Sequence, residues 1–245
     1  MSNSAKVAIV AALEREVHAL VKRWRGVERE YEGRRFRFFK GGETVLVCGG
    51  IGAEAARRAT EAVIALYQPE LVRSVGFAGA LDPGLKVGEI FSPSRVIDAK
   101  DGSSIETGTG FGILVSAAAV AGAQQKEKLK EVYGAHAVDM EAAAVARGAQ
   151  ARGVRFMAVK AISDERTFAM PSLDGFVNGD GQFQTGKFLT FAVLRPWFWP
   201  RVIQLARNSA KASRALCAEL DRSIKEPKEA EVSGPELHPI SKVVN

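Results

Sequence analysis

The alternation of short apolar runs with helical stretches is the feature that most constrains the fold of this chain. Three apolar runs of strand length, residues 6–12, 44–48 and 135–139, are each followed closely by a stretch whose apolar residues recur at helical spacing. Parallel strands need crossover helices, and these helices cover both faces of the sheet. The alternation therefore predicts an α/β fold, a three-layer α/β/α sandwich around a central mixed, mainly parallel sheet.

The remaining pattern predicts further elements. Strands are expected within residues 31–40, 71–76, 89–98, 113–116 and 156–162, with helices at 14–24, 124–133 and 140–152. Helix 124–133 is rich in charge and is expected to be exposed. Glycine and serine predict a loop at 99–109 and a mobile loop at 174–185, and a helical region at 187–224 is expected to be broken by Pro196 and Pro200.

Length and composition fit one domain. The chain has 245 residues, of which 47% are hydrophobic, which is enough to bury a sizeable core. We predict a single domain over residues 1–225, with a basic aromatic helical region at 194–224. Residues 226–245 are polar and interrupted by proline, and this composition predicts a disordered tail.

Several classes of protein are disfavoured. Cys48 and Cys217 lie far apart, and His18, His136 and His238 share no ligand spacing with them or with one another. We therefore expect no disulfide framework, no metal site and a reducing cytoplasm. The first apolar run is too short for a signal peptide, and no segment approaches the roughly 20 apolar residues of a membrane span.

Acidic or glycine-rich stretches fall where predicted strands end, which is where ligands collect in α/β sheets. They are residues 14–16, 49–52, 139–141 and 163–165. Each has an ordinary structural explanation, since acids complement helix N-termini and glycines allow tight strand–helix turns. The glycines at 49–52 lack the third glycine of a dinucleotide fingerprint and a later acid at a strand end, which disfavours a nicotinamide-dependent dehydrogenase.

Taken together, these stretches resemble a known family. The matching segments, in order, are VAIVAALEREV at 7–17, GGIGAEAA at 49–56, GFAGAL at 76–81 with LKVGEI at 85–90, VDMEAAA at 138–144 and VKAISD at 159–164. They resemble the methylthioadenosine/S-adenosylhomocysteine nucleosidases of the nucleoside phosphorylase and nucleosidase family. The resemblance covers roughly residues 6 to 168 and implies cleavage of the N-glycosidic bond of a purine nucleoside.

The resemblance also implies roles for individual residues. Asp164 would protonate N7 of the departing purine, and Glu141 would accept hydrogen bonds from both ribose hydroxyls. Met140 would pack against the sugar or base, and Glu16 would help activate the attacking water. The other residues assigned to substrate are Asp139, Phe77, Gly79, Val120, Ser163 and Lys160, and those assigned to the nucleophile or phosphate are Gly52 and Lys160.

The chain departs from the family at the nucleophile corner. Phosphorylases carry Arg-x-Gly-Ser where this chain has Ser74-Val-Gly-Phe77, and nucleosidases have arginine at the position of Lys160. Lysine is a point charge rather than a fork, so water and phosphate both stay open as the nucleophile. We expect no cofactor, with phosphate as a candidate co-substrate. Val120 replaces an aromatic residue that stacks on the base, and Phe77 or Phe168 could substitute for it.

The segment LRPWFWPRVIQLAR at 194–207 has no counterpart in ordinary nucleosidases. It resembles the hopanoid-associated phosphorylase branch, which is linked to adenosylhopane, an adenine nucleoside with a polycyclic lipid at its 5′ carbon. Aromatic and cationic side chains suit a membrane interface, so the segment is a candidate peripheral membrane contact. A kinked helix packed on the domain or on a dimer partner is the alternative.

The preferred prediction is cleavage of an adenine nucleoside, with ordinary methylthioadenosine/S-adenosylhomocysteine nucleosidase activity as the close alternative. A nucleoside-binding protein without catalysis is a third hypothesis, which the joint presence of Glu16, Glu141 and Asp164 disfavours. The expected partner is a small nucleoside, free or lipid-linked, rather than a nucleic acid. The family also implies a homo-oligomer. The net charge of +6 is compatible with all of these hypotheses.

Overall fold

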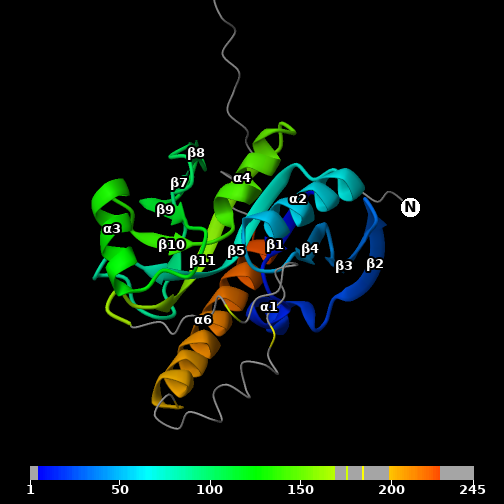
Figure 1. Cartoon of the computed structure of the whole chain (residues 1–245). Helices are drawn as coiled ribbons and strands as arrows, with labels where there is room; N and C mark the ends of the chain where they lie inside the picture. Colours follow the sequence, from blue (N-terminus) through cyan, green and yellow to red (C-terminus); the bar gives the residue numbers. More distant parts are fainter. Residues whose placement is uncertain (1–4, 169–174, 176–183, 185–198, 227–245) are drawn as a thin grey trace, which may run out of the picture.

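The computed structural model describes residues 5–168, 175, 184 and 199–226 (Figure 1). The strands are β1 (Val7–Ala11), β2 (Arg25–Tyr31), β3 (Arg34–Gly41), β4 (Thr44–Cys48), β5 (Leu71–Ala80), β6 (Ile90–Phe91), β7 (Arg95–Asp98), β8 (Ser104–Glu106), β9 (Ile113–Ser116), β10 (Ala137–Asp139) and β11 (Arg155–Asp164). The helices are α1 (Glu14–Val21), α2 (Ala53–Tyr67), α3 (Ala123–Tyr133), α4 (Ala142–Gln150) and α6 (Trp199–Lys225). The predicted mobile loop, the start of the basic aromatic region and the predicted tail fall almost entirely outside the described residues.

The strands form one mixed sheet of 11 strands. Its main path runs β2-β3-β4-β1-β5-β10-β9-β7-β8, while β11 pairs with β5 and β6. Pairing is parallel in the centre, between β1 and both β4 and β5 and between β5 and β11, and antiparallel in the outer hairpins. The central strands are apolar on both faces, as a sheet covered on both sides requires.

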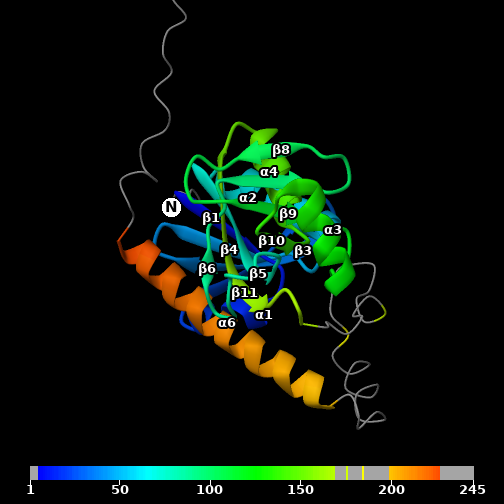
Figure 2. The ribbon, with the colours of Figure 1, turned by 90° about the vertical axis from the view of Figure 1, so that its left-hand side faces the viewer.

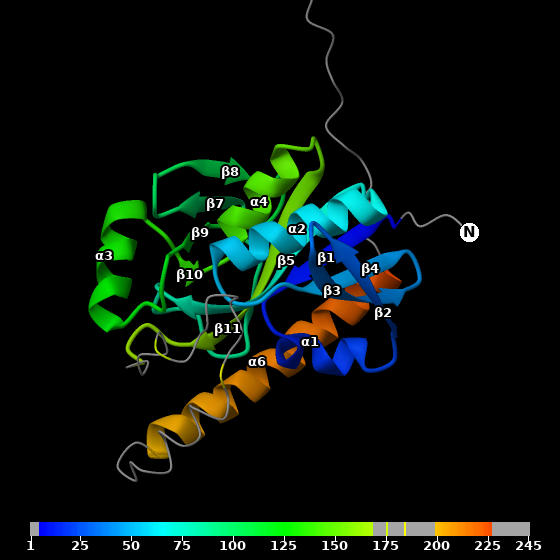
Figure 3. The same ribbon diagram turned by 45° about the vertical axis from the view of Figure 1, so that its right-hand side comes forward.

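Helices cover both faces of the sheet, which confirms the predicted three layers (Figure 2). Helices α2 and α4 pack side by side on one face, and α1 and α6 pack together on the other (Figures 1 and 3). Each face encloses its own hydrophobic cluster, and a third cluster lies under α3 beside β9 and β10. Among the described residues, no helix combines the length and the apolarity of a membrane span.

Two predicted elements were wrong in their bounds. The strand expected at 89–98 is two strands, β6 and β7, with Pro93 between them. Strand β6 pairs with β11, whereas β7 pairs with β9. The loop expected at 99–109 contains β8, which forms a hairpin with β7. Strand β2 was not predicted, because its charged side chains give no clear alternation.

Two helix predictions also need correction. Helix α3 was expected to be exposed, yet Lys126 and Leu129, three residues apart, are buried against the domain. Helix α6 is not broken at Pro200. Pro200 lies in the first described turn of α6, where a proline lacks only an N–H without an intrahelical partner, and Pro196 lies outside the described residues.

The topology brings one group of strand ends together. Strands β1, β4, β5 and β11 are linked by parallel pairing, so their carboxyl ends meet at one edge of the sheet. Gly79 near the end of β5 lies between Val138 of the antiparallel strand β10 on one side and Asp164 at the carboxyl end of β11 on the other. The residues singled out by the sequence are therefore neighbours in space.

Candidate active site

A cavity of about 490 Å³ opens at this edge of the sheet. It contains most of the predicted site residues in its lining, which includes Glu16, Phe77, Gly79, Val120, Asp139, Met140, Glu141, Ser163 and Asp164. Gly52 and Lys160 are not among the lining residues. The lining also contains residues that were not predicted: Arg15, Ile51 and Lys126, with Val202, Leu205, Ala206 and Ser209 from α6.

Glu141 is held at the N-terminus of α4 with its carboxylate in the cavity. Its Oε1 accepts a hydrogen bond from the Gly52 amide at 2.8 Å, and its Oε2 accepts one from the Met140 amide at 3.3 Å. Gly52 has φ +93°, a conformation that favours glycine. Burial, followed by the charge of Asp139, raises the pKa of Glu141 to about 7. Gly52 thus orients the carboxylate of Glu141 in the cavity.

Glu16 lies in the first turn of α1 and lines the same cavity as Glu141. It is only 6% exposed, and its Oε2 accepts a hydrogen bond from the Leu13 amide at 3.4 Å. Gly76 lies beside it with φ +147°, and a Cβ there would lie 3.0 Å from Oε2. Burial, followed by the charge of Glu141, raises the pKa of Glu16 to about 7. A carboxylate with this pKa can accept a proton near neutral pH.

These raised pKa values predict how stability depends on pH. A carboxyl whose pKa is higher in the folded state stabilises the fold at low pH, and this contribution is lost as pH rises through the folded-state pKa. Between pH 4.5 and 7 we therefore expect the unfolding free energy of the wild type to fall relative to Glu16→Gln, by about 2 to 3 kcal/mol. Urea unfolding across this range measures the difference, and parallel curves for the two proteins would contradict the expectation.

Asp139 and Lys160 form a buried pair beneath the floor of the cavity. The Lys160 ammonium donates to Asp139 Oδ2 at 2.8 Å and to Ser74 Oγ at 3.0 Å. Asp139 also accepts from Ser116 Oγ at 2.5 Å and from the Ala142 amide at 2.9 Å. Lys160 ties β11 to β10 across β5, and its predicted role at the substrate or phosphate stays a prediction. Asp139 lines the cavity, but its oxygens hold the α4 N-terminus.

Asp164 ends β11 with its carboxylate in the cavity and is 3% exposed. Its Oδ1 accepts a hydrogen bond from Ser163 Oγ at 2.7 Å. Its Oδ2 forms an ion pair with the ammonium of Lys126, which also donates to the Glu165 carbonyl at 2.9 Å. Sequence reasoning missed Lys126. Its spacing of three residues from Leu129 was the one available signal that it faces inward.

The N-terminal half of α6 forms an apolar wall of the cavity with Val202, Leu205 and Ala206. Phe77 lines the same cavity, so it can supply the aromatic surface that Val120 lacks. Phe168 lines a separate, more polar pocket between α6 and the 165–168 segment, and it does not replace that aromatic residue. Residues more than 100 positions apart in the chain thus share one cavity. Within the described residues, no cluster of three or more histidine, cysteine or acidic side chains could hold a metal ion.

Comparisons with known proteins agree with this geometry. The chain is 31% identical over 113 residues to the 5′-methylthioadenosine/S-adenosylhomocysteine nucleosidase of Marinomonas sp. (strain MWYL1), an alignment that covers 44% of this chain and 46% of that protein, so it spans about half of that relative. It is 26% identical over 196 residues to the protein of the same name from Staphylococcus aureus (strain bovine RF122 / ET3-1), covering 64% of this chain and 86% of that one.

The fold has a close match among solved structures. S-adenosylhomocysteine nucleosidase from Streptococcus pyogenes, in complex with 5-methylthiotubericidin, superposes with a TM-score of 0.68 at 18% identity, covering 92% of this chain and 98% of that one. At that identity the likeness concerns the fold alone. The family model named Phosphorylase superfamily matches residues 6–119 and 109–177, which is well over half of the chain. The chain therefore belongs to the phosphorylase superfamily.

Proposed function

We propose that this chain cleaves the N-glycosidic bond of an adenine nucleoside. The observation that carries the proposal is the convergence of three carboxyl groups in one cavity at the carboxyl ends of the strands, with Glu16 and Asp164 buried and Glu141 half-buried. The names of the sequence relatives support it, since they are methylthioadenosine/S-adenosylhomocysteine nucleosidases. A protein that only binds nucleosides would have no use for a proton donor beside the base.

The three groups can divide the reaction between them. The C1′–N9 bond breaks with its electron pair going to the purine, and the purine takes a proton at N7 from Asp164. Glu141 accepts hydrogen bonds from the two ribose hydroxyls, which strengthen as positive charge develops on the sugar. Glu16 accepts the proton of a water molecule whose oxygen bonds to C1′. The pKa of Glu16 at about 7 suits this last step at neutral pH.

Water is the nucleophile that the cavity favours. Phosphate would need cationic donors near C1′, but the ammonium of Lys160 is already paired with Asp139 below the cavity. The hydroxyl of Ser74, at the corner where the phosphorylases carry arginine, accepts from that same ammonium. A phosphate there would also meet the carboxylate of Glu16. Arg15 also lines the cavity, but the general base that Glu16 offers supports water as the nucleophile.

The test is adenine release from adenosine, methylthioadenosine and a 5′-alkyladenosine, each with and without phosphate. Release that does not depend on phosphate is the expected result. Release only with phosphate would overturn hydrolysis and favour phosphorolysis. Binding of these nucleosides without release of base from any of them would establish the non-catalytic alternative.

The substrate we propose carries a bulky apolar group at its 5′ carbon, as adenosylhopane of hopanoid biosynthesis does. The support is the wall contributed by α6, where Val202, Leu205 and Ala206 line the cavity with apolar surface. A small polar 5′ group would gain nothing from this wall. Ordinary methylthioadenosine/S-adenosylhomocysteine nucleosidase activity is the alternative.

We expect Leu205→Gln to raise KM for a 5′-alkyladenosine about 10-fold or more, because loss of one apolar wall residue costs about 1 to 3 kcal/mol of binding. KM for adenosine should change little. Ile203→Gln is the matched control, since Ile203 is 48% exposed and lies outside the cavity lining. Steady-state kinetics on both substrates decide, and equal effects of the two variants would contradict a 5′ site on α6.

Two further predictions concern partners. The peripheral membrane contact predicted for 194–207 stays a prediction, supported by Trp199 and Ile203, which are 49% and 48% exposed near the start of α6. The homo-oligomer implied by the family is likewise a proposal. Flotation with anionic lipid vesicles tests the membrane contact, and light scattering tests the homo-oligomer.

A further inference from the structure

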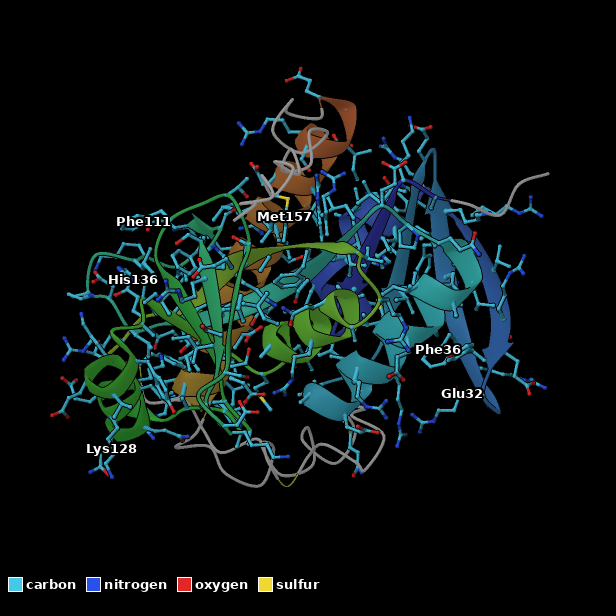
Figure 4. All side chains as sticks on the ribbon, turned by 90° about the horizontal axis from the view of Figure 1, so that it is seen from above. Glu32, Phe36, Phe111, Lys128, His136 and Met157 are labelled. Atoms are coloured by element: carbon cyan, nitrogen blue, oxygen red, sulfur yellow. The ribbon has the colours of Figure 1, made fainter. Side chains whose placement is uncertain are left out.

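Lys126 is a buried charge on the inner face of α3, the face that also buries Leu129. Its side chain is 1% exposed, whereas Lys128, two residues later, points away from the domain (Figure 4). Removing an ammonium from water costs several kcal/mol unless it is paired. A lysine in this position therefore needs a reason, and its side chain ends in the wall of the candidate active site.

The pairing of Lys126 with Asp164 is built into the sheet. The ammonium contacts Asp164 Oδ2 and donates to the Glu165 carbonyl at 2.9 Å. Gly79 lies opposite the pair, and a Cβ at that position would lie 3.0 Å from Asp164 Oδ2 and 3.1 Å from Lys126 Cε. Any side chain larger than hydrogen at position 79 would push the two groups aside. The backbone thus leaves just enough room for this ion pair.

The ion pair places a proton donor, the ammonium of Lys126, directly against Asp164. Asp164, the group that has to protonate the purine, is in contact with an ammonium that carries exchangeable protons. The nearest exchangeable proton is on Nζ of Lys126. Ser163 Oγ, the donor to Asp164 Oδ1, has a far less acidic proton.

We propose that Lys126 supplies the proton that Asp164 delivers to the purine; this inference rests on the proposed function. As the C1′–N9 bond breaks, its electron pair passes to the purine, and N7 binds a proton that leaves Asp164. That proton reaches Asp164 from the ammonium of Lys126, which becomes a neutral amine. Lys126 regains a proton from solvent once the base has left.

Other charged groups surround the pair. On α3 they are Glu127 and Lys130, which pair with Arg166 and Asp82, respectively. After β11 Glu165 pairs with Lys86 at 3.7 Å. Across the cavity lie Arg15, Glu16, Asp139 and Glu141. None of these makes an ion pair with Asp164 among the described residues, so Lys126 is the cation to vary.

Two substitutions separate proton supply from charge compensation. Lys126→Arg keeps the positive charge, but a guanidinium does not release its proton near neutral pH. We expect kcat for adenine release from adenosine to fall about 100-fold or more at every pH tested. Lys126→Met removes the cation and lets the buried Asp164 hold its own proton at low pH. We expect its activity to recover as pH is lowered, with the optimum at least about one unit more acidic than that of the wild type.

A purely structural role for Lys126 predicts the reverse order, with arginine tolerated and methionine inactive at all pH values. That order would overturn the proposal. Wild-type failure to release adenine from any nucleoside would instead refute the proposed function, before the variants are compared.

A 7-methyladenine nucleoside is the control for an intact site. Its base already carries a positive charge and leaves without taking a proton, so both variants should cleave it within a few-fold of the wild type. Loss of cleavage of this nucleoside along with adenosine in both variants would also overturn the proposal, since Lys126 would then organise the site as a whole. Thermal unfolding of each variant accompanies the kinetics.

Discussion

Asparagine in place of Asp164 is expected to lower kcat for adenine release by about 10²- to 10⁴-fold, the usual contribution of a general acid. The amide keeps the size of the side chain and can still accept from Ser163 Oγ, which now bonds Asp164 Oδ1 at 2.7 Å. It can neither carry a proton to N7 nor pair with Lys126. KM should change much less than kcat, because the lost interaction arises in the transition state. Adenine release measured at saturating adenosine tests this.

Glu165→Gln is the matched control, since Glu165 follows Asp164 directly but pairs with Lys86 at the surface. Its kcat should stay within a few-fold of that of the wild type. Asp164→Asn should also keep cleaving the 7-methyladenine nucleoside. Full activity of Asp164→Asn on adenosine would remove the proton-donor role from Asp164.

Asp139→Asn is expected to lower the free energy of unfolding by about 3 to 5 kcal/mol, because it leaves the buried ammonium of Lys160 without its counter-charge. Asp139 and Lys160 are 0% and 1% exposed in their side chains, and their charged atoms lie 2.8 Å apart. The same carboxylate accepts the Ala142 amide, so the start of α4, next to Glu141, should loosen as well. Urea unfolding at neutral pH measures the loss.

Two further variants serve as controls for the loss of stability expected in Asp139→Asn. Asp101→Asn removes a surface partner of Arg147 and should change stability little, since exposed ion pairs contribute little. Asp139→Asn combined with Lys160→Met removes the stranded charge and should restore much of the stability that the single change loses. Equal stability of Asp139→Asn and Asp101→Asn would mean that the interior pair is not needed.

Much of the fold was predictable because its signals are local. Apolar runs such as residues 7–11 and 44–48 must be buried, and the helices between such runs must cover the sheet. Where the signal was weak the prediction was wrong. Strand β2 carries charges on most of its residues, and β8 is only three residues long, so neither shows the alternation that identifies a strand.

The residues of the candidate site also divide into those that local motifs predicted and those that they did not. Glu16, Glu141 and Asp164 could be predicted because each belongs to a short motif at a strand end. The motif of Lys160 was recognised, but its predicted contact with substrate or phosphate stays a prediction, since its ammonium pairs with Asp139. Position in a strand does not say whether a buried ammonium meets a ligand or a carboxylate of the neighbouring strand.

The sequence by itself thus determined the alternation of most strands and helices, the family resemblance and the three carboxyl groups, because all of these are encoded in contiguous segments. Only the tertiary structure decided which buried lysine lies next to which carboxylate or hydroxyl group. Lys126 and Asp164 are 38 positions apart, and Lys160 and Ser74 are 86 apart, so no local pattern relates them. Sheet register and helix packing bring these groups together, and they leave one lysine below the cavity and the other in its wall.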